Sequence, residues 1–276
     1  MGEAAVTEQR IAAVQLESRI GRKAANKRRA EKAIRRAAGE GAKLICLPEA
    51  ILTSGDILEV SSVASAIPGP DTEWLHGLAR ELDIHLVAGL LERADGGEFY
   101  STSVIVAPVD GLVGVYRRVH LHELERRYIS AGESYPHFDL PMGRVGLMQG
   151  YDLNFSDCAA AHLRADVDII VCSALIPATY AYVAEARILV RAMDAECLFV
   201  FASGVGTNLY AGFSYMGRTQ IVADPLYLDW ERCDFMDGEE RFAVLDEEEG
   251  TVHVDIDFER MRRYYSKASL RTDAPL

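Results

Sequence analysis

The sequence lacks any long hydrophobic run. No apolar segment approaches the roughly 18 residues that a helix needs to span a bilayer, and residues 1–10 lack the apolar core of a secretory signal peptide. These absences argue against a membrane protein built from spanning helices and against a signal-bearing secreted protein. We therefore expect a cytoplasmic location and no membrane partner.

Positive charge is scarce relative to negative charge. The chain has 29 Lys and Arg against 42 Asp and Glu, a formal net charge of −13. Because phosphate binding needs a basic face, we expect no nucleic acid as a partner. The charge is uneven, since residues 19–36 are basic and residues 229–259 are acidic. We interpret these two stretches as a solvated helix face and a solvated loop.

Cysteine is rare and is not closely spaced. The five cysteines are an odd number, so a disulfide framework is not indicated, and none of them forms a zinc-ligand spacing. Cysteine in or beside an apolar run packs as a small hydrophobe. We expect reduced thiols, no metal and no cofactor. The five positions are Cys46, Cys158, Cys172, Cys197 and Cys233.

The chain also lacks internal repeats of 20 to 50 residues, low-complexity tracts and any stretch that resembles a linker. Its 276 residues are enough for one large core or two modest ones. We therefore predict a single domain over residues 1–276.

Strands and helices alternate from the start of the chain. A strand over 10–16, a helix over 24–38 and a strand over 43–47 predict a layered α/β fold. A hairpin over 99–107 and 112–116 argues against a simple doubly wound parallel sheet, so we expect two sheets packed face to face and covered by helices. The other predicted helices are 72–82, 158–165 and 181–196, and the other predicted strands are 84–91, 145–148, 167–172, 198–203, 217–223, 242–245 and 252–256.

The stretch over residues 116–155 organises the chain. Its apolar strand over 145–148 ends in the turn Gln149-Gly150-Tyr151-Asp152, which is how a buried strand presents polar groups at its end. Such a turn is a suitable place for a reactive side chain. Its central residue, however, is glycine.

Two charged residues lie at the ends of predicted strands. Glu49 follows a buried strand and Pro48, where low-dielectric surroundings raise the pKa of a carboxyl group toward that of a useful base. A glutamate there could equally cap the next turn. Period-2 alternation puts Tyr116, Arg118 and His120 on one face, although mixed charge of this density is also typical of a solvated loop.

The order of these motifs resembles the nitrilase or carbon-nitrogen hydrolase superfamily. The resemblance implies a four-layer αββα sandwich, a homodimer or higher homo-oligomer, and a small-molecule substrate. It covers nearly the whole chain through the segments IAAVQLE, a glutamate after Leu-Pro, YRRVHL, an acidic residue before YISAGE, VGLMQGYDLNF, RAMDAECLFVFASGVG, GRTQIVADP and VDIDFERMRRYY.

Members of this superfamily use a Glu-Lys-Cys triad, usually with a second glutamate near the lysine. The cysteine attacks a nitrile, amide or carbamoyl carbon, the first glutamate is base and acid, and the lysine stabilises the oxyanion. By resemblance, Glu49 and Glu125 match the glutamates, whereas Arg118 takes the lysine position and Gly150 the cysteine position. Glycine cannot form a thioester, and arginine holds an anion by paired hydrogen bonds without giving up a proton.

Five further residues are expected near the site. Tyr151, Asp152 and His120 are expected to line or brace the pocket. Cys172 ends a strand whose family counterpart approaches the pocket, so its thiol could replace the missing one or simply pack in the core. Tyr180 could form a substrate wall, or it could be an ordinary core aromatic.

Three interpretations remain open. The first is an enzyme that acts on a small, polar, anionic amide-like metabolite by a non-covalent mechanism, with Glu49 as base and acid, Arg118 as anion holder and Glu125 as an orienting group. The second is a pseudoenzyme that binds a ligand or partner. The third is an amidohydrolase whose cysteine was replaced to trap substrate. Arg118 disfavours the third, because trapping needs one change, and retained buried charges are costly unless used, which disfavours the second.

Overall fold

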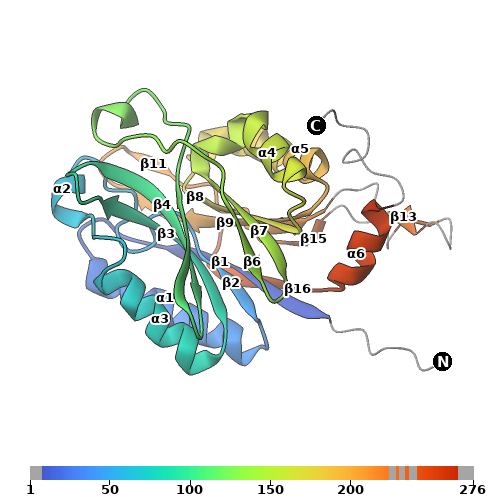
Figure 1. Ribbon diagram of the computed structural model, residues 1–276. Helices are drawn as coiled ribbons and strands as arrows, with labels where there is room; N and C mark the ends of the chain where they lie inside the picture. The colour runs from blue at the N-terminus through green and yellow to red at the C-terminus, as the bar shows by residue number, and fades with distance from the viewer. Residues whose placement is uncertain (1–7, 224–227, 230–233, 236–240, 267–276) are drawn as a thin grey trace.

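The protein consists of two sheets between two layers of helices. The structure is a computed structural model that describes residues 8–223, 228–229, 234–235 and 241–266. Figure 1 shows α1 and α3 on one side of the strands and α4 and α5 on the other. The helices within the described residues are α1 (Lys23–Gly39), α2 (Val60–Val63), α3 (Pro70–Leu82), α4 (Ser156–Arg164), α5 (Ala181–Ala195) and α6 (Phe258–Tyr265), with 3-10 turns η1 (Glu125–Arg127), η2 (Gly150–Asn154) and η3 (Ala178–Tyr180).

The first sheet has the order β5-β4-β3-β2-β1-β16. Strands β1, β2 and β3 are parallel to one another, whereas β4, β5 and β16 add antiparallel pairs. The hairpin of β4 and β5 confirms the predicted one. The strands are β1 (Gln9–Glu17), β2 (Leu44–Cys46), β3 (His85–Arg93), β4 (Phe99–Ala107), β5 (Gly111–Arg117) and β16 (Gly250–Ile256).

The second sheet has the order β6-β7-β8-β9-β12-β15. Its central strands β7, β8 and β9 are parallel. The ends of β1 and β9 also pair in parallel, at Leu16 and Gly204, so the two sheets are continuous there. The strands are β6 (His137–Leu140), β7 (Gly143–Gln149), β8 (Ile169–Ala174), β9 (Leu198–Val205), β12 (Gln220–Val222) and β15 (Arg241–Val244), with small ribbons of β10 (Thr207–Asn208) with β11 (Phe213–Ser214) and β13 (Leu228–Asp229) with β14 (Asp234–Phe235).

Three apolar clusters hold these layers together. The central cluster lies between the sheets and includes Leu44 and Ile105 from the first and Leu147 and Val171 from the second. A second cluster packs the first sheet against α1 and α3, and a third packs the second sheet against α4 and α5. Because both faces of each sheet are buried, the strands read as continuous apolar runs rather than alternating ones. The predicted four-layer αββα sandwich is therefore confirmed.

The predicted helices and strands are found within a few residues of their expected bounds, but some elements were missed. Strand β6 reads HFDL, which alternates polar and apolar residues, but it has only four residues, too few for a clear strand signal, and it is stabilised by pairing with β7. Helix α6 also went unpredicted. Of the five cysteines, four are buried and free, and Cys233 lies outside the described residues.

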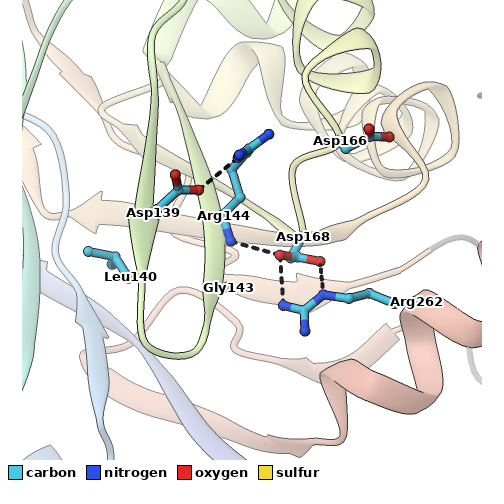
Figure 2. A pocket seen from close by; sticks show the side chains of 7 residues that line it. All are labelled: Asp139, Leu140, Gly143, Arg144, Asp166, Asp168 and Arg262. Atoms are coloured by element: carbon cyan, nitrogen blue, oxygen red, sulfur yellow. Dashed lines mark hydrogen bonds and ion pairs between the residues drawn. The ribbon is translucent and has the colours of Figure 1, made fainter.

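Helix α6 is attached to the second sheet by an ion pair between Arg262, whose side chain is 45% exposed, and Asp168, whose side chain is 8% exposed. Figure 2 shows the Arg262 guanidinium facing Asp168 at the start of β8. Arg262 Nε donates to Asp168 Oδ1 over 2.7 Å and Nη2 donates to Oδ2 over 2.8 Å, while the Arg144 backbone N–H also donates to Oδ2 over 2.7 Å. The paired geometry of arginine and carboxylate fixes the orientation of the helix.

In the part of the chain that the structure describes, no helix is both long and apolar enough to cross a membrane.

Candidate functional site

Three residues of the candidate site follow strands that run in the same direction. Glu49 follows β2, Arg118 follows β5 and Gly150 follows β7. The pairings within each sheet, and the parallel contact of β1 with β9, make these strands mutually parallel. Their carboxyl ends therefore meet at one edge of the sandwich, which is where α/β proteins commonly place ligand sites.

Arg118 lies between two carboxylates. Its Nη1 donates to Glu49 Oε1 over 2.8 Å, and its Nη2 donates to Glu125 Oε1 over 2.5 Å. The side chains of Arg118 and Glu49 are 4% and 8% exposed, whereas that of Glu125 is 20% exposed. Burial lowers the pKa of Arg118, but the two carboxylates outweigh it and raise the pKa above its ordinary value. The guanidinium is therefore a permanent buried cation.

Glu49 receives two more hydrogen bonds. Ser101 Oγ donates to Oε1 over 3.0 Å, and the Leu175 backbone N–H donates to Oε2 over 3.2 Å. Burial nevertheless raises the pKa of the Glu49 carboxyl, because desolvation outweighs the opposing effect of Arg118. A carboxyl group with a raised pKa is suited to both accepting and returning a proton near neutral pH.

Gly150 leaves no room for a side chain beside Glu49. Its φ of +43° lies in the left-handed region that favours glycine. A Cβ at this position would lie 2.5 Å from Glu49 Oε2 and 3.1 Å from Arg118 Nη1. The Glu49 carboxylate thus lies where a side chain at position 150 would begin, and any side chain there would require Glu49 to move.

Asp152 connects the turn after β7 with the segment after β5. It is fully buried and accepts hydrogen bonds from Tyr116 Oη over 2.5 Å, from the His120 backbone N–H over 2.9 Å and from the Gln149 backbone N–H over 3.1 Å. These bonds link Tyr116 and His120, two residues to either side of Arg118, to the turn that contains Gly150, and so hold that turn close to Arg118.

His120 forms the outer part of this connection. Its Nδ1 lies 3.0 Å from Asp152 Oδ1 and its Nε2 lies 3.2 Å from Asp157 Oδ2, while its ring stacks on Phe155 with 3.8 Å between centroids. Tyr135 also donates to Asp157 over 2.8 Å. The hydrogen bond to Asp152 is the main cause that raises the pKa of His120. The protonated imidazole therefore bridges two carboxylates.

This bridge predicts a pH-dependent contribution to stability. A histidine whose folded pKa is raised stabilises the fold fully below its unfolded pKa of about 6.5, and the contribution is lost as pH rises through the folded pKa. The difference in unfolding free energy between the native chain and His120→Gln should therefore be larger at about pH 5.5 than at about pH 8.5 in urea titrations. His85→Gln is the matched control, because burial lowers the pKa of His85 and reverses the sign. Equal differences at both pH values would contradict the bridge.

The other expected site residues differ in how deeply they are buried. Tyr151 is partly buried and meets the ring of Phe155 edge-on at 5.6 Å. Cys172 is fully buried in the cluster facing α4 and α5, and burial raises its pKa well above the ordinary value. Tyr180 lies in η3 and is 57% exposed. The Cys172 thiol is thus shielded from solvent.

Two groups that bind Glu49 were not expected from the sequence. One is Ser101 and the other is the backbone N–H of Leu175. The segment YSTSVIVA carries two serines in alternation within an apolar strand, and this pattern could have indicated Ser101. A backbone donor leaves no such signal in the sequence.

A shallow pocket lies elsewhere, around Asp168 and Arg262 (Figure 2), where Arg262 pairs with Asp168 and Arg144 pairs with Asp139. Its lining consists of Asp139, Leu140, Gly143, Arg144, Asp166, Asp168 and Arg262. Over the described ranges, no group of three or more His, Cys, Asp or Glu side chains could hold a metal ion.

Comparison with known proteins identifies the family. The human omega-amidase NIT2 is 33% identical over 176 residues, which cover 60% of this chain and 63% of the human protein. A nitrilase from Pyrococcus abyssi is 31% identical over 221 residues, 78% of this chain and 81% of that protein. The match to the human enzyme therefore spans less than two thirds of its length.

A similar solved structure is that of a variant of the amidase from Nesterenkonia sp. AN1, described as showing covalent addition of the acetamide moiety of fluoroacetamide at the active site cysteine. It superposes with a TM-score of 0.80 at 19% identity and covers 94% of each chain. The profile of the family described as carbon-nitrogen hydrolase matches residues 10–265. The chain belongs to the carbon-nitrogen hydrolase family.

Proposed function

We propose that the protein hydrolyses a small amide-like substrate by direct attack of water, with no covalent acyl-enzyme. The observation that carries this proposal is the arrangement of Glu49, Arg118 and Gly150. The base and the cation of the site are both buried and hydrogen-bonded, yet the nucleophile position has no side chain. Relatives named omega-amidase and nitrilase support an amide or a related carbon-nitrogen bond as the target.

In this mechanism Glu49 first accepts a proton and then donates it. The carboxylate removes a proton from water as the water oxygen bonds to the amide carbon, and the protonated Glu49 then gives that proton to the departing amine as the carbon-nitrogen bond breaks. The products are the carboxylic acid and ammonia or an amine. The raised pKa of Glu49 suits both steps, because burial makes its carboxylate a stronger base than that of an exposed glutamate.

Arg118 would stabilise the oxygen that becomes negative. Its Nη1 lies 3.1 Å from the point where a Gly150 Cβ would be, close to where the substrate carbon must approach the missing nucleophile. A fixed donor in a buried site stabilises a developing oxyanion more than solvent does. Glu125 would orient the guanidinium through its bond to Nη2.

The same geometry supports an anionic substrate. Glu125 is the more exposed of the two carboxylates on Arg118 and comes from the short turn η1. A substrate carboxylate could therefore replace Glu125 at Nη2 while Glu49 keeps Nη1. A hydrogen bond between a guanidinium and a carboxylate is charge-assisted, so the exchange would favour an anionic group over a neutral one at Nη2.

Ammonia release combined with intact mass spectrometry tests the mechanism. The protein is incubated with succinamate, an amide that carries a carboxylate, and with neutral butyramide as its control. We expect ammonia from succinamate, less from butyramide, and no increase in the mass of the protein at any time. A stable acyl adduct, mapped for example to Cys172, would contradict the non-covalent mechanism.

A second candidate is a binding protein without turnover. It is favoured by the saturation of Arg118, since both terminal nitrogens of the guanidinium already bond carboxylates. In that case succinamate would protect the protein against thermal unfolding but would release no ammonia. The same incubation therefore separates the two candidates.

A further inference from the structure

A layer of polar side chains lies between the candidate site and the apolar cluster in the space between the two sheets. Alternate residues of β4 face this space, so Ser101, which bonds Glu49, is followed inward by Ser103 and then by Ile105 of the central cluster. On β7, Leu147 of the same cluster is followed outward by Gln149. Polar residues thus separate the charged site from the apolar core.

Four side chains form this layer, which we call the polar layer: Ser103, Tyr116, Gln149 and Ser173. Ser103 pairs with Tyr116 in the first sheet, and Gln149 pairs with Ser173 in the second. The two pairs lie near each other across the sandwich, because Tyr116 Oη and the Gln149 backbone N–H bond the same oxygen, Asp152 Oδ2. Each of the four is at most 1% exposed.

The hydrogen-bonding capacity of the polar layer is only partly used by protein groups. Tyr116 donates to Asp152, and Ser173 Oγ donates to the Leu47 carbonyl over 2.8 Å. Ser103 Oγ and both polar atoms of the Gln149 amide, in contrast, have no hydrogen-bond partner among the described residues. The Nε of Arg118, two residues beyond Tyr116 on the same face, also has no hydrogen-bond partner among the described residues.

We propose that the polar layer is a binding site for internal water, held by Gln149 and Ser103 directly beneath Glu49 and Arg118. Buried polar groups are nearly always hydrogen-bonded, and internal water typically makes about three such bonds to groups that protein atoms leave unpaired. Gln149 Nε2 would donate to this water, and Gln149 Oε1 and Ser103 Oγ would accept from it. The proposal concerns the resting protein and holds whether or not the site hydrolyses amides.

The proposed water explains why position 149 carries an amide, because an apolar side chain there could not hydrogen-bond water. A primary amide is a long polar side chain for the interior of a strand, and it directly precedes Gly150. Water between Gln149 and Ser103 can also accept from Arg118 Nε, the guanidinium donor that neither glutamate uses. The charged side chains of Glu49, Arg118 and Glu125 would then lie against a hydrated layer instead of against the apolar core.

A crystal structure of the full chain that shows ordered solvent tests the proposal directly. We expect a water within hydrogen-bonding distance of the Gln149 amide and of Ser103 Oγ. A polar layer without water, or one in which Gln149 bonds Ser103 directly, would overturn the proposal. This measurement does not depend on ammonia release. It therefore tests the water site even if the proposed hydrolysis does not occur.

Urea unfolding of Gln149→Met, Ser103→Ala and the double variant gives a second test. With bridging water, each single change lowers the unfolding midpoint and the double variant loses less than the sum, because the first change already removes the bridge. Ser203→Ala is the matched control: Ser203 is a fully buried serine adjacent in sequence to the inward-facing Ala202, and so faces away from the polar layer. It should add to Gln149→Met without coupling. Raised midpoints in both single variants, with additive effects, would indicate a dry layer and overturn the proposal.

Discussion

The Glu49→Gln variant should lose turnover of succinamate by about 10²- to 10⁴-fold, the usual contribution of a general acid-base residue. Glutamine keeps the size of the side chain and can still accept the bond from Arg118 Nη1, but it cannot take a proton from water. Steady-state ammonia release measures the loss. The variant should fold, because an amide oxygen can replace the carboxylate oxygen as an acceptor for Ser101 and Arg118.

Glu92 provides a matched control for this substitution. It is 1% exposed and bonds Arg117, the neighbour of Arg118, with Arg117 Nη2 donating to Oε1 over 2.5 Å. Glu92→Gln therefore also removes the charge of a buried glutamate paired with an arginine on β5, but on the opposite side of the strand. It should lower stability and leave turnover largely unchanged. If Glu49→Gln retains full turnover, Glu49 is not the base.

The Gly150→Cys, Arg118→Lys double variant should form a covalent adduct that the native chain does not. Introducing a thiol at the end of β7 supplies a nucleophile at the position that the sequence resemblance assigns to cysteine, and replacing the arginine fork by a lysine removes the group that holds Glu49 Oε1. Loss of a nucleophile from a protease triad lowers rate by about 10⁶-fold, which sets the scale of the possible gain in covalent chemistry. Incubation with iodoacetamide and with succinamate, followed by intact mass spectrometry, measures adduct formation.

The single variants indicate which part of the geometry prevents covalent chemistry. Gly150→Cys alone places a Cβ 2.5 Å from Glu49 Oε2 and forces a non-glycine residue into the left-handed region, a strain of about 1–2 kcal/mol. We expect it to be less stable than the double variant and slow to form the adduct. Gly150→Ala is the control for strain without a thiol. An inert double variant that folds would show that the pocket has been remodelled beyond these two positions.

Much of the fold could be predicted because its strands are buried on both faces. Segments such as 43–47 and 198–203 are continuous apolar runs, and their boundaries are marked by proline, glycine or charge. Strand β6 was missed although HFDL alternates polar and apolar residues, because four residues are too few to separate a strand from a loop by that pattern. The pairing of β1 with β9 is likewise a long-range contact without a local signal.

The candidate site was partly predictable for a different reason. Alternation along β5 put Tyr116 and Arg118 on one face, and the structure shows both side chains buried, while the position of Glu49 after a buried strand indicated a desolvated carboxyl group. The sequence could not show that Arg118 bonds both glutamates at once. It also could not show that the Glu49 carboxylate approaches the backbone of Gly150, because that distance depends on how the two sheets pack.

The division of the site between the two sheets bears on the order in which the protein folds. Glu49, Ser101, Arg118 and Glu125 all precede β6 in the chain, so their ion cluster can assemble on the first sheet while it still faces solvent. Docking of the second sheet then brings Gly150 against Glu49 and removes water from these charges, which is costly. Docking of the second sheet should therefore be the step that the charged side chains slow. Neutralising substitutions at Glu49 should accelerate this step.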